Sequence, residues 1–261
     1  MSYAVRDSLT MLRRQLRHMA RYPSLTLMLI GQPLVFLLLF VYVFGGTMGA
    51  GLPGVSAGDR GDYLDFITPG IVLMAVVSVS LGTAIAVATD MTGGIIDRFR
   101  TMAIARVSVL TGHVLGALIQ TAVAVVVVVA VALALGFGPG ASPGDWLATA
   151  GLLALLSLAL TWLTIAIGLV SPNVETASNL PMPLMLLPLV GSGFVPTETM
   201  PDGLRWFAEN QPFTPVIDAL RGLLDGSPDG GTVLLAVAWC VAIGLAGYLW
   251  SRRLYRRRAA G

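Results

Sequence analysis

The segment that decides the fold is LTGHVLGALIQTAVAVVVVVAVALALGF, residues 110–137. It contains no Asp, Glu, Lys or Arg. It is longer than the roughly 20 helical residues that cross a bilayer core about 30 Å thick. Five consecutive valines begin at Val125. Valine is a poor helix former in water, but in lipid only a helix or a closed barrel satisfies the backbone. The segment is therefore predicted to be a transmembrane helix.

The whole chain has the composition of an integral membrane protein. It is 56% hydrophobic and only 11% charged, whereas a soluble domain has about 25% charged residues. We predict an all-α membrane protein with a single transmembrane domain and six spans. The predicted spans are residues 24–44, 66–89, 110–137, 146–170, 174–195 and 232–250.

The arginines are distributed unevenly between the two predicted faces of the membrane. The chain has sixteen arginines and no lysine. One face would hold Arg6, Arg13, Arg14, Arg17, Arg21, Arg98, Arg100, Arg106, Arg252, Arg253, Arg256, Arg257 and Arg258. The other face would hold Arg60, Arg205 and Arg221. Because cationic loops resist translocation, we expect a multi-pass protein of the cell membrane with both termini cytoplasmic. The basic charge then reflects topology, and no nucleic-acid partner is expected.

Residues 1–22 are predicted to form an amphipathic helix at the membrane interface. Its apolar residues recur at helical spacing, with arginines on the opposite face. These apolar residues are Val5, Leu9, Leu12, Leu16 and Met19. The alternative is a basic flank that only sets orientation.

A second amphipathic segment, residues 90–108, lies between two predicted spans on the cytoplasmic side. Gly93 and Gly94 interrupt the helix, and apolar residues then return at helical spacing beside charged ones. The length of the segment, together with its apolar face and its charged face, favours a docking helix. The alternative is an interfacial helix with no partner.

The third irregular segment, residues 196–231, connects the last two predicted spans on the outer side. We expect a short helix over 204–210, a break at Gln211-Pro212, and a second helix with Thr214 as N-cap and Pro215 at its first position. Gly226 is the expected C-cap, and Asp218 can pair with Arg221 three residues on. Both helices are predicted to dip into the outer leaflet as re-entrant helices.

Two stretches carry a resemblance to a known family. They are LPMPLMLLPLVGSGFVPTETMPDGLRWFAENQPFTPVIDALRGLL, residues 180–224, and GIIDRFRTMAIAR, residues 94–106. They resemble the type-2 ABC exporter permeases, in particular the daunorubicin-resistance-type drug exporter permeases. The matching outer residues are Gly193, Phe194, Pro196, Met200, Pro201, Pro212, Pro215, Asp218 and Arg221. Ala103 and His113 depart from the pattern, where proline and arginine are common.

The resemblance implies the permease subunit of an ATP-driven exporter of amphipathic drugs or lipid-like molecules. It implies a separate ATP-binding subunit, which carries ATP and Mg and docks on residues 90–108 and the N-terminal helix. It also implies a second permease subunit, identical or different, within membrane lipid. The chain itself is expected to bind no cofactor. It contains no lysine, so it cannot form a Walker phosphate-binding loop and is not expected to be an enzyme.

The coupling residues implied by the resemblance are Asp97, Arg98, Phe99, Arg100 and Arg106. The alternative is a solvated charged face.

The sequence also suggests residues for a translocation path, namely Gln32, Glu175 and Asn179. Glu175 is an acid near the inner end of a span, where ionisable groups are often functional. The alternatives are an inner-surface carboxylate for Glu175 and bonds between helices for Gln32 and Asn179. No catalytic residues or metal ligands are predicted.

Two other functions stay open at this stage. Export of a polysaccharide or lipid-linked precursor fits the same family. An ion-coupled secondary transporter is the more distant alternative, since it would show membrane-buried acids and inverted repeats. The sequence does not identify the cargo.

Replacement of Arg98 and Arg100 together by alanine should weaken assembly with the ATP-binding subunit or reduce stimulated ATPase activity, because coupling needs a contact whose energy changes between two states. Co-purification and ATPase assays measure both. If assembly and stimulated ATPase are both unchanged, the coupling assignment is wrong.

Overall fold

The computed structural model describes residues 3–21, 23–44, 60–93 and 106–258, and the regular secondary structure in these ranges is entirely helical. The long helices are α1 (Tyr3–Arg21), α2 (Pro23–Leu39), α4 (Arg60–Thr92), α6 (Arg106–Leu135), α7 (Pro143–Val170) and α12 (Gly230–Arg258). The short ones are η1 (Phe40–Phe44), α8 (Val174–Asn179), α9 (Met182–Val190), η3 (Thr197–Thr199), α10 (Asp202–Asn210) and α11 (Phe213–Leu224).

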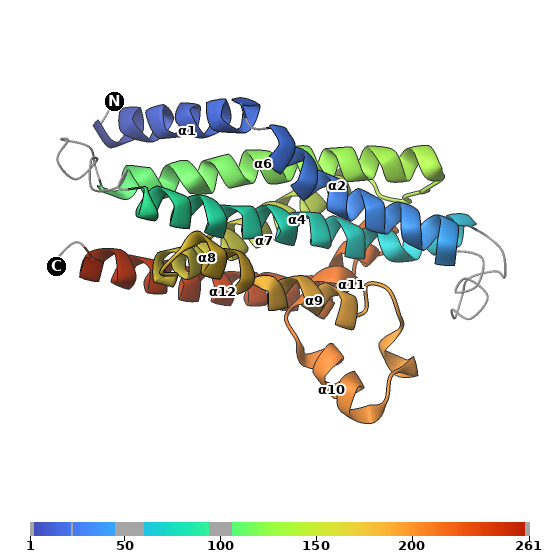
Figure 1. Cartoon of the computed structure of the whole chain (residues 1–261). Coiled ribbons are helices and arrows are strands. Elements are labelled where there is room, and N and C mark those ends of the chain that lie inside the picture. The colour runs from blue at the N-terminus through green and yellow to red at the C-terminus, as the bar shows by residue number, and fades with distance from the viewer. Residues whose placement is uncertain (1–2, 22, 45–59, 94–105, 259–261) are drawn as a thin grey trace.

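Five of these helices are long and apolar enough to cross a membrane, and they lie side by side (Figure 1). Their apolar stretches are Thr26–Val43, Gly61–Thr92, Leu110–Leu135, Pro143–Val170 and Gly230–Tyr255. The stretch in α4 is 83% buried, whereas those in α2 and α12 are each 17% buried. Helix α4 is therefore the centre of the bundle, and α2, α6 and α12 lie at its periphery.

The start of α1 and the end of α12 lie at the same end of the bundle (Figure 1). We call this the terminal end, and we call the opposite end, where α2 ends and α4 begins, the distal end. Helices α6 and α12 extend beyond the predicted spans at the terminal end, so that the predicted basic tail continues α12 as far as Arg258.

The fifth predicted span, residues 174–195, is not one helix. It consists of α8 and α9, which are separated at Leu180-Pro181, and α9 ends at Val190. Proline lacks the N–H that a helix interior needs, and its ring clashes with the preceding turn. Both short helices pack against α4 and follow one another along the bundle (Figure 1). The count of six crossings stays a prediction.

Helix α1 forms over the predicted residues and packs against α6. A Cβ atom added to Gly112 would lie 2.6 Å from Met11 Cβ, and one added to Gly116 would lie 2.6 Å from Gln15 Cγ. Small residues at these positions therefore let the two helices approach closely. Leu16, in the predicted apolar face, is 37% exposed, whereas Met11 is buried.

The backbones of helices α7 and α12 also approach each other very closely. A Cβ atom added to Gly247 would lie 2.6 Å from the backbone nitrogen of Leu163. Beside this contact, the rings of Trp162 and Tyr248 meet edge to face with centroids 5.0 Å apart. The glycine thus sets the distance between the two helices.

Replacement of Gly247 by alanine should lower the free energy of unfolding by about 1–3 kcal/mol, because the added methyl overpacks the contact between α7 and α12. Gly151→Ala is the matched control, since a Cβ atom there meets nothing within 4 Å. Thermal unfolding in detergent, followed by fluorescence-detected gel filtration, compares the two. Equal melting temperatures would show that the contact does not limit packing.

Candidate functional site

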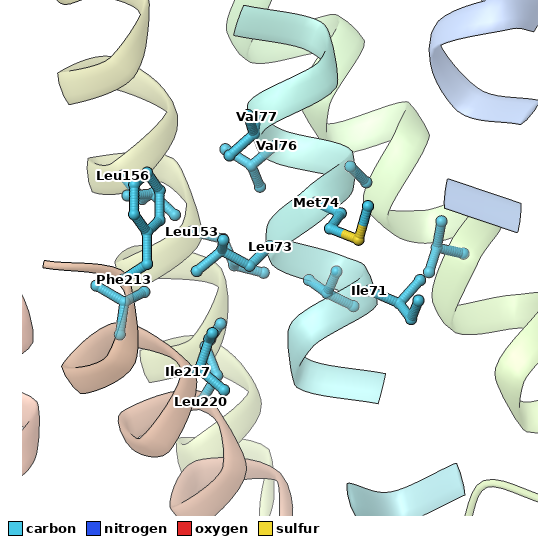
Figure 2. Close-up of a cluster of buried hydrophobic side chains, with 14 of the residues drawn as sticks. Ile71, Leu73, Met74, Val76, Val77, Leu153, Leu156, Phe213, Ile217 and Leu220 are labelled. Atoms are coloured by element: carbon cyan, nitrogen blue, oxygen red, sulfur yellow. The ribbon is translucent and has the colours of Figure 1, made fainter. Parts of the chain in front are cut away.

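Several predicted outer residues lie in or directly before α11, a mostly apolar helix buried in the distal half of the bundle. Helix α11 packs against α4, α7 and α12. Figure 2 shows Phe213 and Ile217 directed towards Leu153 and Leu156 of α7, beside α4. Pro215, in the first turn, is buried as well. In contrast, α10 projects away from the bundle, with Trp206 68% exposed (Figure 1).

The start of α11 differs from the prediction. The helix begins at Phe213 after Pro212, and Thr214 is not its N-cap. Instead the Thr214 hydroxyl donates to the Ala208 carbonyl over 2.5 Å. The Gln211 side-chain amide donates to Thr214 Oγ1 over 3.1 Å and to the Leu187 carbonyl over 3.0 Å. Side chains therefore hold the turn between α10 and α11 against α9, an arrangement that local spacing does not reveal.

The end of α11 is stopped by glycine, as predicted, although Asp225 is the capping residue and Gly226 follows it. Gly226 has φ +72° and donates to the Leu223 carbonyl, while Ser227 donates to Gly222. This pair of bonds is the Schellman arrangement, which favours glycine at the left-handed position. Burial, together with the nearby Asp65 charge, raises the pKa of the Asp225 carboxyl.

The distal cluster consists of Asp218, Arg221, Ser192 and Phe66. Arg221 Nη1 donates to Asp218 Oδ1 over 2.8 Å, which confirms the predicted pairing. Arg221 Nη2 donates to the Ser192 carbonyl over 2.6 Å, and the guanidinium lies 4.4 Å from the centroid of the Phe66 ring. The Ser192 hydroxyl completes the cluster by donating to Asp218 Oδ1 over 2.6 Å. The cluster joins α11 to α4 and to the segment after α9.

Ser192 and Phe66 were not predicted as members of this cluster. The only sequence signal was the pairing of Asp218 with Arg221, because contacts between distant segments leave no local pattern. A cation near an aromatic face is attracted by the ring quadrupole, so Phe66 helps to hold Arg221 in place.

The remaining predicted outer residues lie in the segment between α9 and α10. Gly193 lies against Gly70, where an added Cβ atom would be 3.2 Å from the Gly70 Cα. The Phe194 ring stacks on Phe40 with centroids 4.6 Å apart. Three residues flank short helices: Pro196 precedes η3, Met200 follows it, and Pro201 precedes α10.

The residues predicted for a translocation path are spread over two helices. Gln32 of α2 donates to Met185 Sδ of α9 over 3.4 Å, a bond between helices of the kind named as its alternative role. Glu175 and Asn179 of α8 are exposed and border a shallow hollow of about 560 Å³. Within the described residues, no hydrogen bond connects Gln32 with Glu175 or Asn179.

Four predicted coupling residues, Asp97, Arg98, Phe99 and Arg100, fall outside the described residues. The backbone of Arg106 begins α6, and its side chain is not described.

A second polar cluster, which sequence reasoning did not find, lies at the terminal end. Arg14 of α1 makes a bidentate pair with Asp90 of α4, with distances of 2.7 and 3.2 Å. His113 Nε2 of α6 lies 3.1 Å from Asp90 Oδ2. Asp90 is near the last residue of α4 and His113 is in the second turn of α6, so the pair flanks the predicted coupling segment. The departure at His113 thus proves to be a contact residue.

This terminal cluster borders a cleft of about 480 Å³ between α1, α2, α4 and α6, which we call the polar cleft. Its polar residues include Gln15 and Gln120, and its apolar residues include Leu29, Ile85 and Ala86. Cavities of this size are typical of small-molecule sites.

Asp218→Asn should lower the free energy of unfolding by about 1–3 kcal/mol, because it leaves the largely buried Arg221 without its counter-charge. Glu209→Gln is the control, since it removes the same kind of charge from the exposed pair that Glu209 forms with Arg205. Thermal unfolding should show a loss for Asp218→Asn and no measurable change for Glu209→Gln. Equal losses would contradict a special role for the distal cluster.

Comparison with known proteins identifies one family. Residues 7–224 match the family model described as ABC-2 type transporter, a range that runs from α1 to the last residue of α11. The chain is also 32% identical over 267 residues to the daunorubicin resistance ABC transporter permease protein DrrB1 of Streptomyces coeruleorubidus. That similarity covers 98% of this chain and 88% of the relative. The chain therefore belongs to the ABC-2 type transporter family.

Proposed function

We propose that this chain is the transmembrane permease subunit of an ATP-driven exporter that moves amphipathic drugs or lipid-like molecules out of the cytoplasm or the inner leaflet. The observation that carries the proposal is the family match over residues 7–224, combined with the nearly full-length similarity to a drug-resistance permease. The apolar bundle supports it, because five helices suit a bilayer.

The proposed topology has six crossings, and α8 and α9 together form the fifth. The start of α1 and the end of α12 share one end of the bundle, which supports an even number of crossings (Figure 1). A broken helix is tolerated at membrane depth where protein covers it, and both α8 and α9 pack against α4. The arginine distribution places the terminal end in the cytoplasm. In this topology α10 and α11 form the outer re-entrant segment, and α1 runs alongside the cytoplasmic part of α6 (Figure 1).

The energy would come from ATP bound with Mg on a separate subunit, since this chain has no lysine for a Walker loop. That subunit would dock on residues 90–108 and α1. The terminal cluster supports this site, because Asp90 and His113 join the helices on either side of the segment and Arg14 attaches α1 to Asp90. A movement of the docked segment would therefore reach α1, α4 and α6 at once.

Transport would take place between two permease subunits, either identical or different. Helices α2, α9 and α12 carry exposed apolar side chains that lipid or a second subunit would cover; examples are Met28, Leu186 and Leu234. Glu175 and Asn179 are exposed at the cytoplasmic start of the fifth crossing, where they would meet cargo that enters between the subunits.

Co-expression with the ATP-binding subunit encoded beside this chain tests the proposal. We expect a stable complex whose vanadate-sensitive ATPase is stimulated by amphipathic drugs or lipids. Stimulation only by a polysaccharide or lipid-linked precursor would replace the drug assignment with the other export function. If no ATP-binding subunit forms a complex and transport follows an ion gradient instead, the chain is a secondary transporter.

A further inference from the structure

We infer that the polar cleft is a binding site for an anionic amphiphile of the inner leaflet, with the headgroup beside Arg14 and His113 and the chain along Leu29 and Ile85. The site is separate from the path proposed between two subunits. The inference rests on the cytoplasmic orientation in the proposed function but not on ATP-driven transport.

The two kinds of lining give the cleft its amphipathic character. Arg14, Asp90 and His113 lie at one part of the wall, and Leu29, Ile85 and Ala86 supply an apolar part. On α2, the residues just before Leu29 point outward, since Leu27 is 67% and Met28 is 71% exposed. Lipid that surrounds α2 therefore lies next to the apolar wall. A purely polar metabolite would leave this wall unused.

Several polar atoms of the cleft have no hydrogen bond that would compete with a ligand. Within the described part of the chain, the side-chain amides of Gln15 and Gln120 form no hydrogen bond. His113 is only 5% exposed, and its Nδ1 atom has no partner there. A buried polar atom without a partner is rare, because the loss of its hydration is not compensated. A headgroup with several acceptor oxygens would supply partners for the amide donors of Gln15 and Gln120.

The charges around the cleft favour an anion. Asp90 is the acid in its lining, and the bidentate pair with Arg14 neutralises it. Helix α1, which lines the cleft, also carries the exposed residues Arg13, Arg17 and Arg21. Basic helices at the inner surface attract anionic lipids. A cationic ligand would have to displace Arg14 from Asp90 and approach these arginines.

Two sources offer this chemistry: an anionic phospholipid that resides in the cleft, or an anionic amphiphile on its way to export. To test the site itself, the complex with its ATP-binding subunit is placed in discs of phosphatidylcholine with a minor fraction of phosphatidylglycerol. Native mass spectrometry then counts the phosphatidylglycerol that remains bound after release from the discs.

Three variants and two controls address the cleft. Arg14→Gln and Gln120→Leu remove headgroup contacts, and Ala86→Phe fills the apolar part without changing any charge. Arg17→Gln removes the same charge from an exposed position on α1, and Val126→Phe places a phenylalanine on the exposed face of α6.

We expect selective retention of phosphatidylglycerol by the unmodified chain and by both controls. Retention should fall about tenfold in Arg14→Gln, as expected for loss of one charge-assisted hydrogen bond. It should fall severalfold in Gln120→Leu and be lost in Ala86→Phe. Because Gln120→Leu and Ala86→Phe keep the ion pair of Arg14 with Asp90, the test does not depend on Arg14→Gln folding. Equal retention in all variants, or an equal loss in Arg14→Gln and Arg17→Gln, would overturn the inference.

ATPase assays with an alkyl phosphate as stimulant distinguish the two sources. An increased KM for the alkyl phosphate in Gln120→Leu, with unchanged kcat, identifies the cleft as an entry site for cargo. An unchanged KM, with basal activity that follows the phosphatidylglycerol content, identifies a resident lipid. Absence of any ATPase would count against the proposed function alone, because the retention measurement does not require turnover.

Discussion

The structure depends on α4, a helix that is enclosed by other helices along almost its whole length. Two of its buried hydroxyl groups bond within the helix itself, since Thr68 and Ser80 donate to the carbonyls four residues earlier. In a bilayer, helices gain little from hydrophobic burial against each other, so close packing and hydrogen bonds provide the stabilisation. The remaining elements are arranged according to how closely they can approach this helix.

Small residues determine that approach. A Cβ atom on Gly168 of α7 would lie 2.7 Å from the Ala84 carbonyl oxygen of α4, and one on Gly70 would lie 2.9 Å from the Gly193 carbonyl oxygen. The first contact brings α7 against α4, and the second brings the segment after α9 against the distal part of α4. Glycine is required at these sites because any side chain would separate the backbones.

The two polar clusters lie near opposite ends of α4. Phe66, in the second turn of the helix, faces Arg221, while Asp90, in its last turn, binds Arg14 and His113. In the proposed function the first end faces outward and the second adjoins the coupling segment. Helix α4 would then connect the site of ATP-driven movement rigidly with the re-entrant segment. Arg221 contacts it near one end, and Arg14 and His113 contact it near the other.

The predictions from sequence succeeded where the signal was local and failed where it was not. The amphipathic spacing of residues 3–21 predicts α1, and the spacing of Asp218 and Arg221 predicts their ion pair. Thr214 was misassigned because its hydroxyl is committed to Ala208 of the preceding helix. No spacing rule relates Arg14 to Asp90, which lie 76 residues apart.

By itself, the sequence determined that this chain is a helical membrane protein, because its long uncharged segments can satisfy their backbone only as helices in lipid. Its motifs also identify the ABC-2 type transporter family. Only the tertiary structure decided which polar residues meet, since residues such as Ser192, Phe66, Asp90 and His113 acquire their contacts when segments distant in the chain pack together. It likewise decided that a cleft lies between α1, α2, α4 and α6, because a cavity is a property of four packed helices and of no single segment.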